Sequence, residues 1–313
     1  MSALRLPVRI GTRGSPLALA QAHMVREALA ATTPDLAAQG AVEIVVIKTT
    51  GDRVLDRPLA EIGGKGLFTK EIEDALLDGS IDMAVHSMKD VPTTLPPGLV
   101  IAAMLPREDP RDALIAGECR RIADLPEGAV VGTASLRRGA QLLVLRPDLR
   151  VVSFRGNVQT RLRKLAEGEV AATFLAMAGL KRLGLESAAS AALEPDEMLP
   201  AVCQGAVGIE IREGDEPVLE LLARIDHAET FRRAVAERAF LAALEGSCRT
   251  PIAALAEFDA DGAGLTFRGL VARPDGSGLV RTERKASAAD AEVVGAVAGA
   301  EIRAGLPADY FAA

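Results

Sequence analysis

Short apolar runs alternate with segments of helical periodicity along the first two thirds of the chain. The run Val8–Ile10 is followed by a glycine-containing turn and by Ser15-Pro16, an N-cap with proline at the first helical position. The pattern then predicts a helix over 17–30, a strand over 42–47, a helix over 67–77 and a strand over 81–85. Alternating strands and helices are typical of an α/β fold with mostly parallel sheets, whose functional loops lie at the carboxyl ends of strands.

The order of these elements recurs further along the chain. Three pairs of segments match: 10–12 with 131–133, 51–52 with 156–157, and 78–81 with 167–170. The offset between their glycines falls from 121 to 105 and then to 89 residues, as a duplication with shorter loops in the second copy would produce. We therefore expect two related α/β lobes that face each other across a cleft.

Proline-containing segments mark the joins between these lobes. Residues 105–110 leave the first lobe, residues 194–200 leave the second, and the apolar strand 206–211 returns to the first. The predicted division is a first lobe of residues 1–105 plus 201–224, a second lobe of 106–200 and a C-terminal domain of 225–313. Two chain crossings between lobes would form a hinge.

The C-terminal residues predict a small α+β domain with a three-stranded antiparallel sheet. Its first helix, Thr230–Leu244, is expected to end with Gly246 as its C-cap, because Pro251 follows shortly after. Three strands separated by Asp-Gly turns are expected near 252–258, 265–272 and 279–285, followed by an alanine-rich helix over 288–304.

Composition and charge argue against a nucleic-acid partner. The 313 residues carry a formal charge of −7 and include no Trp, one Tyr and eight Phe, so a broad basic surface and a set of stacking rings are both missing. The segment from Gly132 to Arg182 departs from this average, with ten basic and three acidic residues and a net charge of +7. A basic island in an acidic protein indicates a focused site for an anionic small molecule.

The N-terminal sequence and the cysteine positions bear on localisation, disulfides and metal sites. The N-terminus has no secretory pattern, and no apolar run reaches the roughly 18 residues that span a bilayer, so we expect an unprocessed cytoplasmic protein without membrane contact. Cys119, Cys203 and Cys248 are too few and too widely spaced for a disulfide framework, and no metal-ligand spacing is present. No metal site is predicted.

Two residues are candidates for chemistry. A free cysteine is most often buried and inert, but Cys248 lies on a loop beside Arg249, between glycine and proline, which favours an accessible thiolate as nucleophile or attachment point. An aspartate before a proline-containing turn is most often a turn former. Asp90, however, follows a strand whose carboxyl end faces the expected cleft, and it is the best-placed acid for charge stabilisation or proton transfer.

Several arginines of the basic segment lie at junctions between elements, where loops gather. They are Arg137, Arg138, Arg155 and Arg161. A solvated basic face is the ordinary explanation of a charge run, but several planar guanidinium groups in one place suit a ligand with several carboxylates or phosphates. The stretch Gly63–Gly66 lacks the P-loop pattern, and we interpret residues 53–66 as a mobile lid.

Seven stretches form a specific pattern that spans nearly the whole chain. They are GTRGSPLA (11–18), GGKGLF (63–68), AVHSMKDVP (84–92), REDPRD (107–112), GTASLRR (132–138), FRGNVQTR (154–161) and LEGSC (244–248). In this order they resemble the porphobilinogen deaminase family, whose members are also called hydroxymethylbilane synthases.

The resemblance implies two related lobes like those of periplasmic binding proteins and a third domain that bears the cofactor. It implies that Cys248 holds a dipyrromethane, made from two porphobilinogen units, through a thioether, and that Asp90 is the catalytic carboxylate beside the pyrrole nitrogens. It assigns carboxylate binding to Arg13, Lys89, Arg137, Arg138, Arg155, Arg161 and Arg182, with Ser15, Ser87, Thr133, Ser135, Asn157 and Gln204 nearby, and the lid loop to Lys65 and Phe68. A monomer is expected.

The implied reaction is the stepwise condensation of four porphobilinogen molecules on the dipyrromethane, with loss of ammonia and a final hydrolysis to linear hydroxymethylbilane. Positive charge builds on both reacting pyrrole rings, and one well-placed carboxylate stabilises such charge by about 3 kcal/mol. A six-ring chain would carry about twelve carboxylates, whose repulsion the arginines offset. One departure from the family pattern is Cys203, which stands where glycine is usual.

Two other functions fit the residues. A non-catalytic cytosolic two-lobed binding protein for a small polycarboxylate would not need Cys248. An acyl or phosphoryl transferase built on the loop Gly63–Gly66 would need a nucleotide or a metal.

Overall fold

The chain folds into two compact units, each built around its own five-stranded sheet. The computed structural model describes residues 5–53, 66–246, 250–307 and 310–311. The first unit contains the described parts of residues 1–57, 61–108 and 206–231, and the second contains those of 109–205 and 232–313. The second unit also holds a three-stranded sheet. The division into a first lobe, a second lobe and a C-terminal domain at the boundaries given above remains a prediction.

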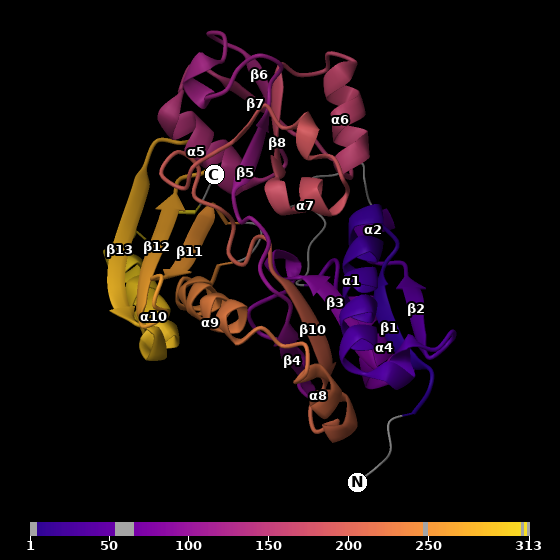
Figure 1. Ribbon diagram of the computed structural model, residues 1–313. Helices are drawn as coiled ribbons and strands as arrows, with labels where there is room; N and C mark the ends of the chain where they lie inside the picture. The colour runs from indigo at the N-terminus through magenta and orange to yellow at the C-terminus, as the bar shows by residue number, and fades with distance from the viewer. Residues whose placement is uncertain (1–4, 54–65, 247–249, 308–309, 312–313) are drawn as a thin grey trace. The chain divides into compact units, whose positions relative to one another are not determined.

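The first sheet has the strand order β2-β1-β3-β10-β4 (Figure 1). Its strands are β1 (Val8–Arg13), β2 (Val42–Ile47), β3 (Met83–Ser87), β4 (Leu99–Met104) and β10 (Val207–Arg212). Strand β1 pairs in parallel with β2 and β3, whereas β10 is antiparallel to both β3 and β4. The return of the chain to this sheet, expected for residues 206–211, is confirmed, and the returning strand lies between β3 and β4.

The second sheet repeats this arrangement, in the order β7-β6-β8-β5-β9. Its strands are β5 (Asp112–Ile115), β6 (Val130–Gly132), β7 (Arg150–Val152), β8 (Ala172–Ala176) and β9 (Ala191–Ala192). Strand β6 is parallel to β7 and β8, and β5 is antiparallel to β8 and β9. The predicted pair of related lobes is therefore confirmed in topology, and each sheet contains one reversed strand.

Helices cover both faces of each sheet, because successive strand residues point to opposite faces and both faces are apolar. On the first sheet, α1 (Pro16–Thr32) and α8 (Glu216–Leu222) pack with Val8, Ile10 and Met83, while α4 (Lys70–Leu77) packs with Ile81 and Ala84 on the other face. On the second sheet, α5 (Leu136–Leu145) covers one face, and α6 (Val158–Ala166) and α7 (Met177–Arg182) cover the other. The shorter helices are α2 (Thr50–Arg53) and the 3₁₀ turns η1 (Pro34–Ala37), η2 (Met88–Asp90), η3 (Ile122–Asp124), η4 (Glu186–Ala188) and η5 (Ala288–Asp290).

The C-terminal residues form the expected antiparallel sheet, β11 (Ile252–Phe258), β12 (Gly264–Ala272) and β13 (Leu279–Ser287). Helices α9 (Ala228–Ala243) and α10 (Ala291–Gly305) accompany it. A side chain at Gly295 would meet the carbonyl oxygen of Ala236, so glycine is what lets the backbones of these two helices approach closely. Leu255 and Leu270 pack with Ala140 of α5, which joins this sheet to the five-stranded sheet of the same unit.

Several predicted element ends are wrong; the strand expected over 81–85, for example, is Met83–Ser87. Strand β1 continues through Thr12 and Arg13, because these residues pair with β2. Helix α4 begins at Lys70 rather than Leu67, since the backbone is still turning after Gly66, whose φ is +76°. The C-cap assignment of Gly246 is also wrong: Glu245 takes the left-handed conformation, with φ at +51°, and the N–H of Gly246 reaches back to the carbonyl of Leu241.

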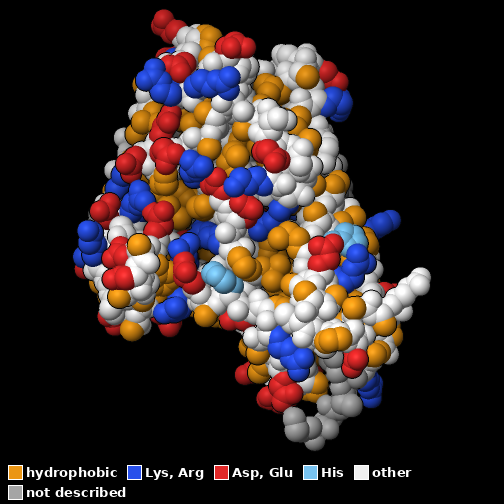
Figure 2. Space-filling view, viewed as in Figure 1, with side chains coloured by type: hydrophobic (Ala, Val, Ile, Leu, Met, Phe, Trp, Pro, Cys, Tyr) orange, Lys and Arg blue, Asp and Glu red, His pale blue; other side chains and the backbone are white. Residues whose placement is uncertain are grey.

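Surface charge is mixed on the face seen in Figure 2, where Lys and Arg side chains are interspersed with Asp and Glu side chains. Part of the excess of arginine in the basic segment lies inside the second unit, because Arg137 and Arg138 are only 5% and 6% exposed. Among the described residues, no helix combines the length and the hydropathy needed to cross a bilayer.

Candidate functional site

A small pocket, with a cavity volume of about 20 Å³, lies in the first unit at the carboxyl ends of β1 and β3. It is lined by Arg13, Ala18, Gln21, Phe68, Thr69, Val85, His86, Ser87 and Asp90. Four of these residues, Arg13, Phe68, Ser87 and Asp90, are predicted site residues, and the fold brings them together from β1, β3 and the turns that precede α4 and follow β3.

Asp90 ends the 3₁₀ turn η2, directly after β3, and its carboxylate faces Arg13. The Oδ2 atom of Asp90 lies 3.8 Å from Nη1 of Arg13, and the two side chains are 32% and 22% exposed. The guanidinium carbon of Arg13 also lies 4.1 Å from the centre of the Phe68 ring, a cation–π contact. Arg13 thus contacts both the Asp90 carboxylate and the Phe68 ring, and the carboxylate remains accessible to a ligand.

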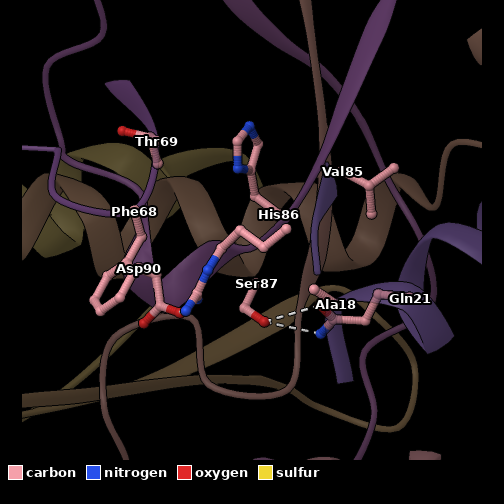
Figure 3. A pocket seen from close by; sticks show the side chains of 9 residues that line it. Ala18, Gln21, Phe68, Thr69, Val85, His86, Ser87 and Asp90 are labelled. Carbon is pink, nitrogen blue, oxygen red and sulfur yellow. Dashed lines mark hydrogen bonds and ion pairs between the residues drawn. The ribbon is translucent and has the colours of Figure 1, made fainter. Parts of the chain in front are cut away.

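Ser87 and Gln21 form a polar pair in the wall of this pocket (Figure 3). The hydroxyl of Ser87 lies 2.9 Å from Nε2 and 3.0 Å from Oε1 of Gln21. Gln21 was missed in the sequence, although one signal is present: it is a buried amide on the apolar face of α1, between Ala18 and Val25. A buried polar residue in such a stripe needs a partner, and here the partner is Ser87.

In the second unit, Arg137 and Arg138 share one buried carboxylate, that of Asp112. Nη1 of Arg137 lies 2.6 Å from Oδ2 of Asp112, and Arg138 donates from Nε and Nη2 to Oδ1 at 3.0 and 2.6 Å. Both arginines also donate to backbone carbonyls, Arg137 to Leu199 at 2.8 Å and Arg138 to Phe174 at 2.9 Å. Their orientation is therefore set by the protein itself before any ligand binds.

The electrostatics of this cluster follow from burial. Burial alone would raise the pKa of Asp112, but the charges of Arg137 and Arg138 outweigh it and hold that pKa well below its usual range. Burial lowers the pKa of Arg137, and the Asp112 charge opposes this effect. One carboxylate faces two guanidinium groups, so the cluster keeps an excess positive charge that an anionic ligand can neutralise.

Arg161 extends this positive cluster without a protein partner. Its Nε atom is buried, and the side chain makes no hydrogen bond or ion pair within the part of the chain that the structure describes. Burial, together with the positive charge of Arg138, lowers the pKa of Arg161 to about 10. A half-buried guanidinium without a counter-ion is costly, so this residue fits the carboxylate of a bound ligand.

Gln204 and Arg182 hold the chain segment that precedes β10. Nε2 of Gln204 donates to Oδ1 of Asp112 at 3.0 Å and to the carbonyl of Pro110 at 2.8 Å. Nη2 of Arg182 donates to the carbonyl of Gly205 at 2.8 Å. Asp112, which the sequence analysis missed, is thus the common partner of three predicted residues, Gln204, Arg137 and Arg138.

Three predicted polar residues are helix N-caps. The side chains of Ser15, Ser135 and Asn157 accept hydrogen bonds from the backbone N–H groups of Ala18, Arg138 and Thr160 respectively. They begin α1, α5 and α6, whose positive dipole ends lie at the carboxyl ends of β1, β6 and β7. In the structure, each of these side chains caps the N-terminus of its helix.

The remaining predicted residues are placed as follows. Thr133 is buried just after β6, Arg155 follows β7, and Lys89 lies in η2 beside Asp90. Cys203 is 1% exposed, takes a φ of +58°, and donates its backbone N–H to Glu237 at 2.6 Å. Cys248 and Lys65 lie outside the described residues.

Comparison with known proteins gives a consistent result. Residues 8–220 match the family model "Porphobilinogen deaminase, dipyromethane cofactor binding domain", and residues 231–304 match "Porphobilinogen deaminase, C-terminal domain". A porphobilinogen deaminase of Paracoccus denitrificans is 60% identical over 97% of this chain and 96% of its own length. A chloroplastic porphobilinogen deaminase of Oryza sativa is 60% identical over 88% of this chain and 77% of its own length.

Solved structures give a weaker likeness. A periplasmic substrate-binding protein of an ABC transporter from Coxiella burnetii is 17% identical and covers 74% of this chain and 96% of its own. The TM-score is 0.42, a level at which the likeness carries no argument.

Proposed function

The chain belongs to the porphobilinogen deaminase family, and we propose that its reaction is carried out by Asp90 of the first unit and the arginine cluster of the second. The family activity is that of a transferase, which condenses four porphobilinogen molecules head to tail on a dipyrromethane primer and releases ammonia and then hydroxymethylbilane. The non-catalytic binding protein is not favoured, because the match extends over both domains of an enzyme family.

The unpaired guanidinium of Arg161 is the observation that carries the binding part of the proposal. Arg137 and Arg138 are held by Asp112, so their charge is fixed in place, while Arg161 beside them has no counter-ion among the described residues. Acetate and propionate groups supply the carboxylates that such a site takes. Arg137 also keeps a buried Nε atom that lacks a hydrogen-bond acceptor in the described structure.

Asp90 is proposed as the catalytic carboxylate. It lies in a pocket that is partly closed by Phe68, and Arg13 holds it from one side. A fixed carboxylate at the pyrrole nitrogens would stabilise the positive charge that develops there and would hold the nitrogen-bound proton. Ser87 and Gln21 form the neighbouring wall, where their amide and hydroxyl groups can orient a ring N–H or a carboxylate.

Cys248 is proposed as the attachment point of the dipyrromethane. The cofactor supplies an electron-rich pyrrole carbon as the nucleophile of the condensation. Support for this residue comes from the sequence LEGSC, which follows α9, and from the match of residues 231–304 to the family's C-terminal domain, which includes Cys248. We further propose a cytoplasmic monomer that needs no metal and binds neither nucleic acid nor membranes.

Intact-protein mass spectrometry after denaturation tests this assignment. The wild-type chain is expected to carry an adduct of two pyrrole units, and Cys248→Ser is expected to lack it. Cys203→Ser is the matched control and should keep the adduct, because that thiol is buried. An unmodified mass in active wild-type protein would contradict the proposed attachment.

A further inference from the structure

His86, which lines the pocket beside Ser87, makes a buried hydrogen bond with Glu210. Nε2 of His86 is 2.9 Å from Oε2 of Glu210, and the two side chains are 4% and 0% exposed. The imidazole of His86 points away from the Ser87–Gln21 pair (Figure 3), as alternation along a strand requires. The second oxygen of Glu210, Oε1, is buried and has no hydrogen-bond partner in the described structure.

A second buried acid faces the same place from α4. Glu73 is 7% exposed, burial raises its pKa, and the charge of Glu210 raises that pKa further, whereas the charge of His86 lowers it. Glu73 lies one turn after Thr69, which is the N-cap of α4 and lines the pocket. His86, Glu210 and Glu73 therefore form one cluster, the His86 cluster, between β3, β10 and α4.

This cluster adjoins the turn that carries Asp90. Gly208 of β10 lies opposite His86, and Met88 of η2 packs so closely against it that a side chain at 208 would meet the Met88 sulfur. The backbone N–H of Met88 donates to the carbonyl of Ala206 at 3.0 Å. The His86–Glu210 hydrogen bond thus joins β3 to β10 at the point where β3 ends and η2 begins.

We propose that His86, through its hydrogen bond to Glu210, is a positioning residue that fixes the β3–η2 junction and thereby the carboxylate of Asp90. Removing the bond leaves a buried acid without its partner, and water or a strand displacement must then satisfy it. A displacement of about 1 Å at a reacting group costs up to roughly 100-fold in rate. This inference rests on the proposed role of Asp90.

The test separates positioning from stability. His86→Leu and Glu210→Leu are each expected to lower both the melting temperature and kcat, since each leaves a buried polar group alone. The double variant H86L/E210L removes both partners, so its melting temperature should recover, as replacement of buried pairs by apolar groups often allows. Its kcat should stay about tenfold or more below wild type, with KM within about twofold.

His86→Gln supplies a second measurement, because its amide can donate to Glu210 in place of Nε2. We expect this variant to keep most of the wild-type kcat. His23→Leu is the control and should leave kcat unchanged, because His23 lies on α1 and does not line the pocket. A folded H86L/E210L protein with wild-type kcat would overturn the proposal, as would a folded H86Q as inactive as H86L. Asp90→Ala, measured alongside, distinguishes the two ideas: full activity there would refute the role of Asp90 itself.

Discussion

Nη1 of Arg137 lies 2.6 Å from Oδ2 of Asp112, and the two side chains are 5% and 0% exposed. An arginine that matches the ligand-binding residues of its family is therefore already paired inside the protein. Because Arg138 shares the same carboxylate, one buried acid holds two guanidinium groups in fixed positions. The anion binding proposed for this cluster would use charges that are already in place, so little reorganisation would be needed when a ligand binds.

Asp112→Asn is expected to destabilise the protein by about 3–5 kcal/mol, since it leaves two buried guanidinium groups without their counter-ion. The pKa of Asp112 is lowered in the fold, so its contribution is present at neutral pH and is lost as the pH falls through the folded pKa. Denaturant unfolding at several pH values measures this. Asp148→Asn is the control, because Asp148 pairs with Arg146 at the surface, and it should have a much smaller effect. Equal losses in both variants would contradict the prediction.

Arg161→Met is expected to stabilise the ligand-free protein and to weaken substrate binding. The unpaired cation costs stability while it is charged, and its pKa of about 10 lies below the usual value, so the advantage of the variant should shrink as the pH rises above 10. We expect a melting temperature higher by about 2–4 °C and a KM raised by about 10- to 100-fold, for one lost charge-assisted hydrogen bond. Arg163→Met, on the exposed side of α6, should change neither. A lower melting temperature for R161M would show that Arg161 has a counter-ion.

Asn157 offers a way to separate capping from binding. Asn157→Ala should cost about 1 kcal/mol, because the 2.8 Å bond from Thr160 N–H to the side chain is lost. Asn157→Asp keeps the cap, so its stability should match wild type, but its charge lies one turn from Arg161 and should raise KM. Thermal melts and steady-state kinetics on the two variants measure both effects. An unchanged KM in N157D would assign Asn157 to capping alone.

Asp90→Ala is expected to fold normally and to lose about 10²- to 10³-fold in turnover of porphobilinogen, the usual cost of one group that stabilises transition-state charge. The side chain is only partly buried, and its described charged partner is Arg13, so little stability depends on it. Asp74→Ala serves as the control, because Asp74 forms an exposed pair with Lys70 on α4. Circular dichroism checks the fold, and full turnover in D90A would remove Asp90 from the mechanism.

The sequence by itself determined most helices and strands, and it placed the candidate functional residues at the carboxyl ends of strands. Ser15 and Asn157 cap helices where their residue types predict a cap, and Asp90 follows a strand as expected. The repeated glycine-containing turns predicted two related lobes, and the two five-stranded sheets share one topology. Such features depend on residues a few positions away in the sequence, so they can be predicted from the sequence alone. The end of α9 shows the limit: Gly246 was expected to take the special conformation, but Glu245 takes it, because the helix ends one residue earlier.

Only the tertiary structure decided which side chains meet. Asp112 reaches Arg137 across 25 residues, Gln21 reaches Ser87 across 66, and His86 reaches Glu210 across 124. Each meeting depends on which strands and helices lie side by side, and the meeting of His86 with Glu210 depends on the insertion of β10 between β3 and β4. Hydrophobic periodicity fixes which face of a strand is buried, but it does not fix which strand lies beside it, since any apolar strand edge offers the same backbone hydrogen bonds. The pairing of Asp112 with Arg137 and Arg138 therefore follows from the assembled sheet and not from the sequence pattern.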